Sequence, residues 1–168
     1  ANYDIAISNW MRKEKKLEQN YHLDSQQLIQ TLRYGENPHQ KANWYGSYIS
    51  GWKKAKQLQG KELSYNNLLD LESALSTVLE FNKNRYVESS NAAVILKHNN
   101  PCGAAISSSI EDAFKKALEC DPISAFGGIV ALNNVVNMDT AKQLSNIFLE
   151  CVVAPSFSKE ALAILETK

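Results

Sequence analysis

The chain has 168 residues, of which 44% are hydrophobic, and this suits one compact domain with or without a docking extension. Its 18 basic and 18 acidic residues balance, so no overall field favours binding to a nucleic acid or to an anionic membrane. The three cysteines are odd in number and lack paired spacing, which argues against a disulfide framework and for the reducing cytoplasm.

Neither end of the sequence carries a targeting or stop signal. No apolar stretch is long enough to span a bilayer, and residues 1–4 lack both a Met and the charged-then-apolar order of a signal peptide. The helix predicted at the other end has no Gly or Pro to end it. We therefore expect a processed chain or a fragment of a longer protein.

The chain is predicted to begin with a helix and two strands. Residues 1–20 have the pattern of an amphipathic helix whose apolar face includes Trp10. Strands are predicted at 28–34 and 44–50, because a polar loop with turn residues separates two strand-like runs. A helix over 68–81 follows, and Asn66 or Asn67 suits its N-cap. A polar loop therefore leads into a helix N-terminus.

Strands and helices then alternate to the end of the chain. The predicted strands are 92–96, 128–132 and 151–154, and the predicted helices are 110–119, 139–149 and 158–166. The strands are apolar throughout rather than alternating, as expected when helices cover both faces of a sheet. This order indicates a layered α/β domain.

Lys97 and His98 follow the apolar run at 92–96 directly and precede a polar turn. Open parallel sheets bind ligands just beyond the carboxyl ends of their strands, so a lysine and a histidine that emerge there can act on a substrate. The alternative is a strand that simply ends in solvated polar residues. The pair is the first candidate for chemistry.

Two further loops offer groups for a ligand. Arg33 presents a fork of donors that matches phosphate oxygens, and the ring of Tyr34 can lie against a heterocycle. A surface arginine beside a packed tyrosine would have the same pattern. In the loop 121–128, Phe126 offers an aromatic wall and Gly127 lets a backbone N–H approach a ligand, unless the glycines only shape a turn.

Several classes of site lack their motifs. There is no GxGxxG and no GxxxxGK[ST], so neither a dinucleotide fold nor a P-loop is supported. A deaminase-type zinc site needs a second cysteine soon after Cys102, but position 105 is Ala. It also needs a glutamate after His98, where two asparagines stand instead. We therefore predict no metal site and interpret Cys102 as a small packed residue rather than a nucleophile.

Five motifs occur in a fixed order and run through nearly the full chain. They are LRYGENPHQ at 32–40, KELSYNN at 61–67, LKHNNPCG at 96–103, DPISAFGG at 121–128 and VVAP at 152–155. In this order they resemble the transformylase part of the AICAR transformylase/IMP cyclohydrolase family. The ordered set is far more specific than any one of its members.

The resemblance implies transfer of a formyl group from 10-formyltetrahydrofolate to the 5-amino group of aminoimidazole carboxamide ribonucleotide (AICAR), in purine (IMP) synthesis. It also implies a three-layer α/β/α lobe of the cytidine-deaminase type with a mixed sheet, duplicated in the complete transformylase. Residues 28–168 would form the first lobe, and residues 1–27 a helical docking segment. The second lobe, which supplies folate contacts across a homodimer interface, and the cyclohydrolase domain are absent from this sequence.

The resemblance also assigns roles to site residues. Lys97 and His98 fall at the reacting centre, with His98 as the base and Lys97 as electrostatic stabiliser or acid, although the two roles can be exchanged. Within the binding site, Arg33 would hold the phosphate and Glu150 would accept hydrogen bonds from the ribose hydroxyls. The residues that would bind the ribonucleotide are Arg33, Tyr34, Asn67, Phe126, Gly127 and Glu150.

Two interpretations without catalysis stay open. Lacking the second lobe, the chain can be a nucleotide-binding lobe that does not turn over substrate. It can also be an assembly module that dimerises through its first helix. Nucleotide binding without formyl transfer favours the first interpretation, and failure to bind either ligand favours the second.

Overall fold

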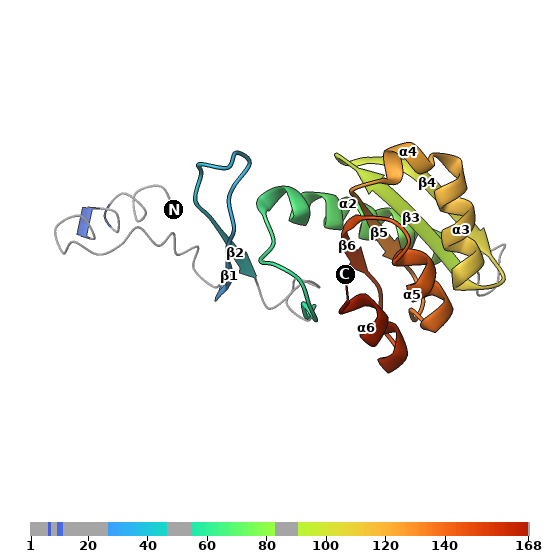
Figure 1. Ribbon diagram of the computed structural model, residues 1–168. Helices are drawn as coiled ribbons and strands as arrows, with labels where there is room; N and C mark the ends of the chain where they lie inside the picture. Colours follow the sequence, from blue (N-terminus) through green and yellow to red (C-terminus); the bar gives the residue numbers. More distant parts are fainter. Residues whose placement is uncertain (1–6, 8–9, 12–26, 47–54, 83–90, 168) are drawn as a thin grey trace. The chain divides into compact units, whose positions relative to one another are not determined.

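The computed structural model describes residues 7, 10–11, 27–46, 55–82 and 91–167 (Figure 1). The chain divides into two compact units. The first comprises Ala1–Thr31 and Asn43–Lys56, and the second, called the α/β unit here, comprises Leu32–Ala42 and Gln57–Lys168. All the candidate site residues named above belong to the α/β unit.

The two early strands are present close to their predicted positions. They are β1 (Gln27–Leu32) and β2 (Ala42–Gly46), and they pair in a two-stranded sheet. Residues 47–50, predicted to continue the second strand, lie outside the described residues. Residues 7, 10 and 11 of the predicted N-terminal helix are described and are helical, and the rest of that helix lies outside the described part of the chain.

The α/β unit is built on a four-stranded mixed sheet with the strand order β4-β3-β5-β6. Its strands are β3 (Asn91–Lys97), β4 (Asn100–Ser107), β5 (Gly128–Leu132) and β6 (Leu149–Val153). β3 is antiparallel to both β4 and β5, whereas β5 and β6 are parallel. The carboxyl end of β3 therefore lies at the same edge of the sheet as the amino ends of β5 and β6.

Helices pack on both faces of this sheet (Figure 1). α2 (Tyr65–Asn82) packs against β3, β5 and β6, and α3 (Ile110–Cys120) packs against β3 and β4. The short α4 (Pro122–Ala125), in a stretch predicted as loop, follows α3, and α5 (Met138–Leu144) and α6 (Lys159–Leu165) pack against each other. The predicted α/β class with a mixed sheet is confirmed. No helix among the described residues is both long and apolar enough to cross a membrane.

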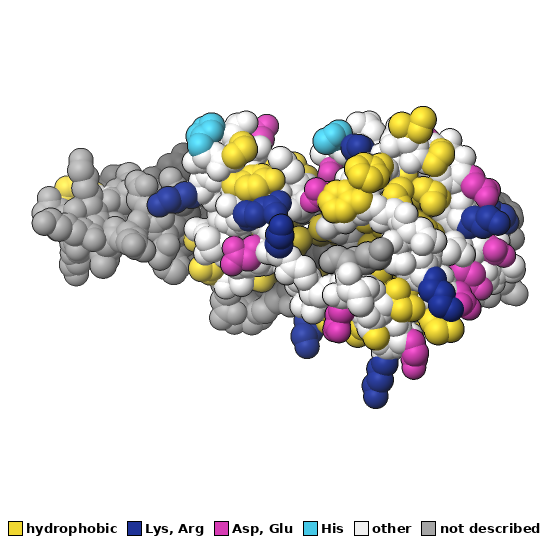
Figure 2. Space-filling model, viewed as in Figure 1, with side chains coloured by type: hydrophobic (Ala, Val, Ile, Leu, Met, Phe, Trp, Pro, Cys, Tyr) yellow, Lys and Arg dark blue, Asp and Glu magenta, His cyan; other side chains and the backbone are white. Residues whose placement is uncertain are grey.

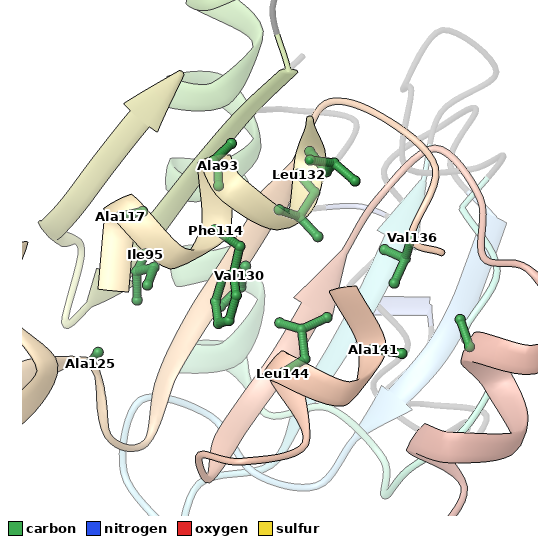
Figure 3. Packing of buried hydrophobic residues seen from close by; sticks show 13 residues of the cluster. Ala93, Ile95, Phe114, Ala117, Ala125, Val130, Leu132, Val136, Ala141 and Leu144 are labelled. Atoms are coloured by element: carbon green, nitrogen blue, oxygen red, sulfur yellow. The ribbon is translucent and has the colours of Figure 1, made fainter. Parts of the chain in front are cut away.

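The strands of the sheet contribute core residues to both faces, since successive side chains of a strand alternate. Ala93 and Ile95 of β3 join Val130 and Leu132 of β5 in a cluster with Phe114 of α3, which is fully buried (Figure 3). The intervening residues of both strands are also buried, and α2 packs against both strands. Burial on both faces explains why these strands are apolar throughout.

The largest departure from the predicted elements is β4, where the sequence predicts a turn and loop. His98 and Asn99 have φ of 52° and 61° and form a two-residue hairpin turn of type I′, so the chain reverses at once. Pro101 is tolerated because β4 is an edge strand. Gly103 allows the strand and α3 to approach closely, since an added Cβ would lie 1.9 Å from the carbonyl oxygen of Ala117.

Two helix boundaries also differ from the prediction. α2 begins at Tyr65 and not at 68, because Ser64 accepts the hydrogen bond from the N–H of Asn67 and so caps the helix. Asn67 therefore lies in the first turn and is not the cap. α5 ends at Leu144, where the sequence predicts helix to 149, and β6 consequently starts two residues before its predicted beginning at 151.

Candidate functional site

The carboxyl end of β3 carries the two residues that the sequence singles out for chemistry. Lys97 is the last residue of β3, and its ammonium donates a 2.7 Å hydrogen bond to the carbonyl oxygen of Phe126. Phe126 and Gly127 immediately precede β5, the antiparallel neighbour of β3. The candidate site therefore lies where the carboxyl end of β3 meets the amino end of β5. The sequence analysis expected a site formed by the carboxyl ends of parallel strands, and this expectation was wrong.

The loop before β5 is joined to the start of β6. Gly127 has a φ of 71°, and its N–H donates to the carbonyl oxygen of Phe148 at 2.8 Å. The rings of Phe126 and Phe148 lie with their centroids 5.5 Å apart and their planes inclined by 48°. A glycine is required at 127 because this turn needs a left-handed backbone. Together, the two loops present one aromatic surface.

This aromatic surface is open to solvent. Phe126 and Phe148 are 59% and 56% exposed, and Ile123 of the adjoining α4 is 87% exposed. Figure 2 shows hydrophobic side chains at the surface of the α/β unit. Exposed aromatic rings can stack against a flat ligand, so Phe126 can form a wall beside Lys97.

His98 is the first of the two turn residues between β3 and β4 and is exposed. Its φ of 52° lies in the left-handed region, which residues other than glycine adopt rarely and which is enriched at functional sites. The His98 carbonyl oxygen accepts a 2.8 Å hydrogen bond from the side chain of Asn100. The imidazole is therefore displayed at the tip of a hairpin, next in the chain to Lys97.

The hairpin tip is fastened to α2. The backbone N–H of Asn99 donates to Asp70 Oδ1 at 2.8 Å. The Asn99 side-chain amide faces three oxygens of α2, and its two N–H groups can donate among them when the nitrogen points to the helix. The distances are then 2.9 Å to Ser73 Oγ, 3.1 Å to Asp70 Oδ1 and 3.2 Å to the Leu69 carbonyl oxygen. The turn that carries His98 is thus held by the helix packed against the sheet.

The first turn of α2 brings Asn67 beside Glu150 of β6. Ser64 Oγ accepts a hydrogen bond from the Asn67 N–H at 3.2 Å. In return, Asn67 Oδ1 accepts from the N–H and the hydroxyl of Ser64, both at 3.0 Å. This reciprocal cap orients the Asn67 side-chain nitrogen toward Glu150 Oε2, at 3.5 Å. Two predicted binding residues from distant segments therefore meet.

Arg33 and Tyr34 lie on a segment held against the start of α2. The N–H of Arg33 donates to the Leu63 carbonyl oxygen at 2.9 Å, and the Tyr34 carbonyl oxygen accepts from the N–H of Tyr65 at 3.1 Å. The Arg33 guanidinium lies 4.9 Å from the centroid of the Tyr34 ring and donates to its hydroxyl at 3.3 Å. The pair forms a stacked unit whose arginine is exposed.

Electrostatics connect Arg33 with the start of β6. Burial, with a smaller contribution from the Glu150 carboxylate, raises the pKa of the Cys151 thiol to about 11. The Arg33 guanidinium opposes this rise in pKa, and the Asp70 carboxylate adds slightly to it. The pKa of Cys151 is therefore set mainly by burial and is adjusted by charges on Arg33, Glu150 and Asp70.

Cys102 is a packed thiol, as the sequence analysis expects. Its Sγ donates to the carbonyl oxygen of Ile95 at 3.5 Å. Burial raises the pKa of this thiol, which disfavours the thiolate that a nucleophile requires. Among the residues that the structure describes, no three His, Cys, Asp or Glu side chains are grouped so that they could hold a metal ion.

Six of the eight predicted site residues contact one another in pairs. Lys97 with Phe126, Asn67 with Glu150, and Arg33 with Tyr34 are the bonded pairs, and His98 and Gly127 adjoin them in the chain. Two residues of the edge were missed. Phe148 could have been found as an aromatic residue just before an apolar strand, but nothing in the sequence marks Asp70.

Comparisons with known proteins give one consistent family. The chain matches the family model described as AICARFT/IMPCHase bienzyme over residues 1–168. The bifunctional purine biosynthesis proteins PurH of Prochlorococcus marinus strains MIT 9301 and MIT 9211 are 65% and 58% identical to it. Each alignment covers 100% of this chain and 33% of the relative, so the chain spans about a third of their length.

A solved structure gives a likeness of fold alone. It is the crystal structure described as that of a formate dehydrogenase accessory protein from Desulfotalea psychrophila. It aligns with a TM-score of 0.50 at 11% sequence identity and covers 59% of this chain and 47% of that one. The α/β arrangement is therefore shared with a protein of very different sequence.

Proposed function

Because the chain belongs to the AICARFT/IMPCHase bienzyme family, we propose that it forms part of a formyl-transfer site in a longer enzyme of purine biosynthesis. AICAR would accept the formyl group on its 5-amino nitrogen, and 10-formyltetrahydrofolate would donate it. The residues of this edge support the transformylase step and not the cyclohydrolase step. The activity proposed is that of the full-length enzyme that carries this chain.

One observation carries the proposal: Lys97 and His98 share a sheet edge with the exposed Phe126. The Lys97 ammonium donates a 2.7 Å hydrogen bond to the Phe126 carbonyl oxygen, which holds it against the loop that precedes β5. His98 follows at the hairpin tip with an exposed side chain. A cation and an imidazole beside an apolar wall suit a reaction that moves both charge and a proton.

The chemistry gives each group of the pair a task. The acceptor is a poorly nucleophilic aromatic amine, and its attack on the formyl carbon creates an anionic oxygen while the nitrogen loses a proton. The neutral imidazole of His98 takes that proton, directly or through the neighbouring carboxamide. The Lys97 ammonium stabilises the oxyanion or protonates the departing folate nitrogen. An exchange of these two tasks is the alternative mechanism.

The binding residues suit the remaining parts of a ribonucleotide. Arg33 offers a guanidinium to the phosphate, and Tyr34 stacks beneath that guanidinium. Glu150 can accept hydrogen bonds from the ribose hydroxyls, with Asn67 alongside at 3.5 Å. Phe126 would cover one face of the imidazole carboxamide while the backbone at Gly127 contacts it. The contact between Asn67 and Glu150, which come from segments far apart in the sequence, supports a single nucleotide site.

We also propose the wider architecture that the family suggests. Residues 28–168 would form the first of two cytidine-deaminase-like lobes, and residues 1–27 a docking segment. A second lobe would supply folate contacts, and a homodimer would share each active site between subunits. No metal is required by this scheme, and the three unpaired thiols suit the cytoplasm.

The roles of the pair are tested by formyl transfer in a full-length family enzyme that carries this chain. Asparagine tolerates a left-handed backbone, so His98→Asn keeps the turn and removes only the imidazole. We expect kcat to fall by about 10²–10⁴-fold in His98→Asn and in Lys97→Met. Lys115→Met, which changes an exposed lysine of α3, should keep kcat. An unchanged kcat in both site variants would refute the proposed roles.

Nucleotide binding is tested separately, by titration calorimetry of this chain with AICAR. The predicted nucleotide contacts all lie in the one α/β unit, so we expect a complex in the absence of folate. Arg33→Ala should weaken it by about tenfold or more, as expected for a lost phosphate contact. Binding without turnover would favour the nucleotide-binding lobe, and no binding would favour the assembly module.

A further inference from the structure

The turn that carries His98 is fastened on both sides by asparagines. On one side, the Asn100 side chain donates to the His98 carbonyl oxygen at 2.8 Å. On the other, Asn99 is bonded to α2 through both its backbone and its side chain. Because His98 and Asn99 have φ of 52° and 61°, both central residues of the turn are left-handed, as a type I′ hairpin requires.

Asp70 is the principal acceptor for this turn. Its Oδ1 accepts the Asn99 N–H at 2.8 Å and, with the amide nitrogen turned to the helix, also the Asn99 side-chain nitrogen at 3.1 Å. Ser73 Oγ and the Leu69 carbonyl oxygen provide further acceptors for the same amide, at 2.9 and 3.2 Å. A half-buried carboxylate on a regular helix therefore holds the tip of the hairpin.

The same helix supports the proposed nucleotide site. Asn67, which faces Glu150, and Asp70, which holds Asn99, lie three residues apart, about one helical turn, on α2. The reciprocal cap between Ser64 and Asn67 fixes the start of this helix. α2 thus sets the position of the turn relative to the residues proposed to hold the ribonucleotide.

We propose that Asp70 is a positioning residue, which acts through Asn99 to fix the turn that directs the His98 imidazole at the reacting centre. This inference rests on the proposed function, since Asp70 affects formyl transfer only if His98 takes part in it. What Asp70 supplies to Asn99 is a hydrogen-bond acceptor at Oδ1. Asp70→Asn keeps an acceptor oxygen at this position. It should therefore still hold the turn in place, even though it removes the negative charge of the carboxylate.

The first test compares Asp70→Ala with Asp70→Asn in the full-length family enzyme that carries this chain. Loss of the acceptor should lower kcat by about 10- to 100-fold, as expected for a misplaced catalytic group, with the KM for AICAR within about threefold. Asp70→Asn should restore kcat to within about threefold of the original enzyme. Ser76→Ala, whose hydroxyl donates to Glu72 on the same helix, is the matched control and should leave kcat unchanged.

The second test is a double-mutant cycle with His98→Asn. If Asp70 acts only by placing His98, its loss has no further consequence once the imidazole is gone. The double variant Asp70→Ala/His98→Asn should then have a kcat within about twofold of His98→Asn alone. A residue that merely stabilises the fold would give additive losses, so additivity would overturn the proposal.

A third readout follows the imidazole itself in this chain. The sequence has three histidines, so their ring resonances can be separated by NMR and the His98 signal identified as the one lost in His98→Asn. Asp70→Ala should shift or broaden this signal and leave the other two in place, whereas Asp70→Asn should restore it. A His98 signal unmoved by Asp70→Ala would count against the proposal.

The outcomes separate this inference from the proposed function. If His98→Asn lowers kcat and Asp70→Ala does not, only the positioning role is wrong. If His98→Asn leaves kcat unchanged, the proposed base is wrong whatever Asp70 does. Should Asp70→Ala fail to fold, Asn99→Gly leaves α2 intact, tolerates the left-handed backbone and removes the amide, and it must lower kcat without adding to His98→Asn.

Discussion

Gly127 shows how one residue fixes the geometry of the site edge. Gly127 has a φ of 71°. It follows Phe126, whose carbonyl oxygen accepts a hydrogen bond from Lys97, and it precedes the first residue of β5. A Cβ added there would approach the Phe148 ring at 3.8 Å, which is an ordinary contact. The cost of a side chain at 127 is therefore conformational and not steric.

We predict that Gly127→Ala lowers the free energy of unfolding by about 1–2 kcal/mol, because alanine is strained in the left-handed region. The same strain should displace the Phe126 carbonyl oxygen, and so lower formyl transfer in the full-length enzyme. Gly60→Ala is the matched control, since Gly60 has a φ of 91° and a Cβ there would make only an ordinary contact, 4.0 Å from Gln57 Nε2. It should cost similar stability in urea unfolding and leave formyl transfer intact.

Cys151 reports on the charges around the proposed nucleotide site. With a pKa of about 11, its thiolate makes up roughly one part in a thousand at pH 8. We predict that iodoacetamide labels the exposed Cys120 first and that labelling of Cys151 speeds up about tenfold per pH unit up to pH 11. Mass spectrometry of the labelled peptides measures both rates.

Arg33 tests the electrostatic assignment of Cys151. Since the guanidinium lowers the pKa of Cys151 against the effect of burial, Arg33→Met should raise that pKa and slow the labelling of Cys151 further. The labelling of Cys120 serves as the internal control. Faster labelling of Cys151 in Arg33→Met would show that the arginine shields the thiol instead.

At the scale of elements, β4 shows what the sequence pattern could not provide. Proline and glycine are depleted in strands, and two asparagines are typical of a turn, so Pro101 and Gly103 indicate a loop. The strand forms because it pairs with β3 as an edge strand. β5, by contrast, was predicted with its observed bounds, because Gly127–Gly128 and Asn133–Asn134 enclose an apolar run.

Gly103 marks a close approach between β4 and α3. An added Cβ would lie only 1.9 Å from the carbonyl oxygen of Ala117. Because this oxygen belongs to the backbone, it cannot rotate out of the way as the end of a side chain could. We predict that Gly103→Ala forces the strand and helix apart and costs about 1–3 kcal/mol or more in urea unfolding. Ala104→Ser, in the same strand but exposed, should change stability by less than about 0.5 kcal/mol.

Ser64 joins the stability of α2 to the proposed binding role of Asn67. Removing the cap with Ser64→Ala should cost about 1 kcal/mol and remove the hydroxyl that donates to Asn67 Oδ1, so that only the backbone N–H of residue 64 still holds this oxygen. We therefore predict weaker AICAR binding by calorimetry as well as lower stability. Ser158→Ala removes the equivalent cap of α6, at 3.1 Å from Ala161 N, and should lower stability alone. Equal AICAR binding in both variants would contradict the role of Asn67.

At the scale of the molecule, strand direction decides where the site lies. Lys97 and Phe126 are 29 residues apart, and they meet because β3 runs antiparallel to β5. Periodicity predicts that strands exist but not how they pair, so the sequence pattern alone could name Lys97 and not its partner. The motif resemblance supplied Asn67 and Glu150, and pairing of β5 with β6 brings Glu150 to the same edge.

The core and the site edge of the α/β unit use phenylalanine in opposite ways. Phe114 is fully buried in the hydrophobic cluster (Figure 3). Phe126, by contrast, is 59% exposed at the site edge. We predict that Phe114→Ala costs about 3–5 kcal/mol, a large share of the stability of a typical domain. Phe126→Ala should cost less than about 1 kcal/mol and still weaken AICAR binding.

Urea unfolding and calorimetry on the same preparations separate these two effects. Phe114 packs in the hydrophobic core and is not a predicted ligand contact. Any Phe114→Ala protein that remains folded should therefore bind AICAR with nearly unchanged affinity. Phe126→Ala should unfold at nearly the original urea concentration but bind AICAR less tightly. If Phe126→Ala proved as destabilising as Phe114→Ala, the aromatic surface of Phe126 and Phe148 would be part of the core, and its proposed role as a ligand wall would fail.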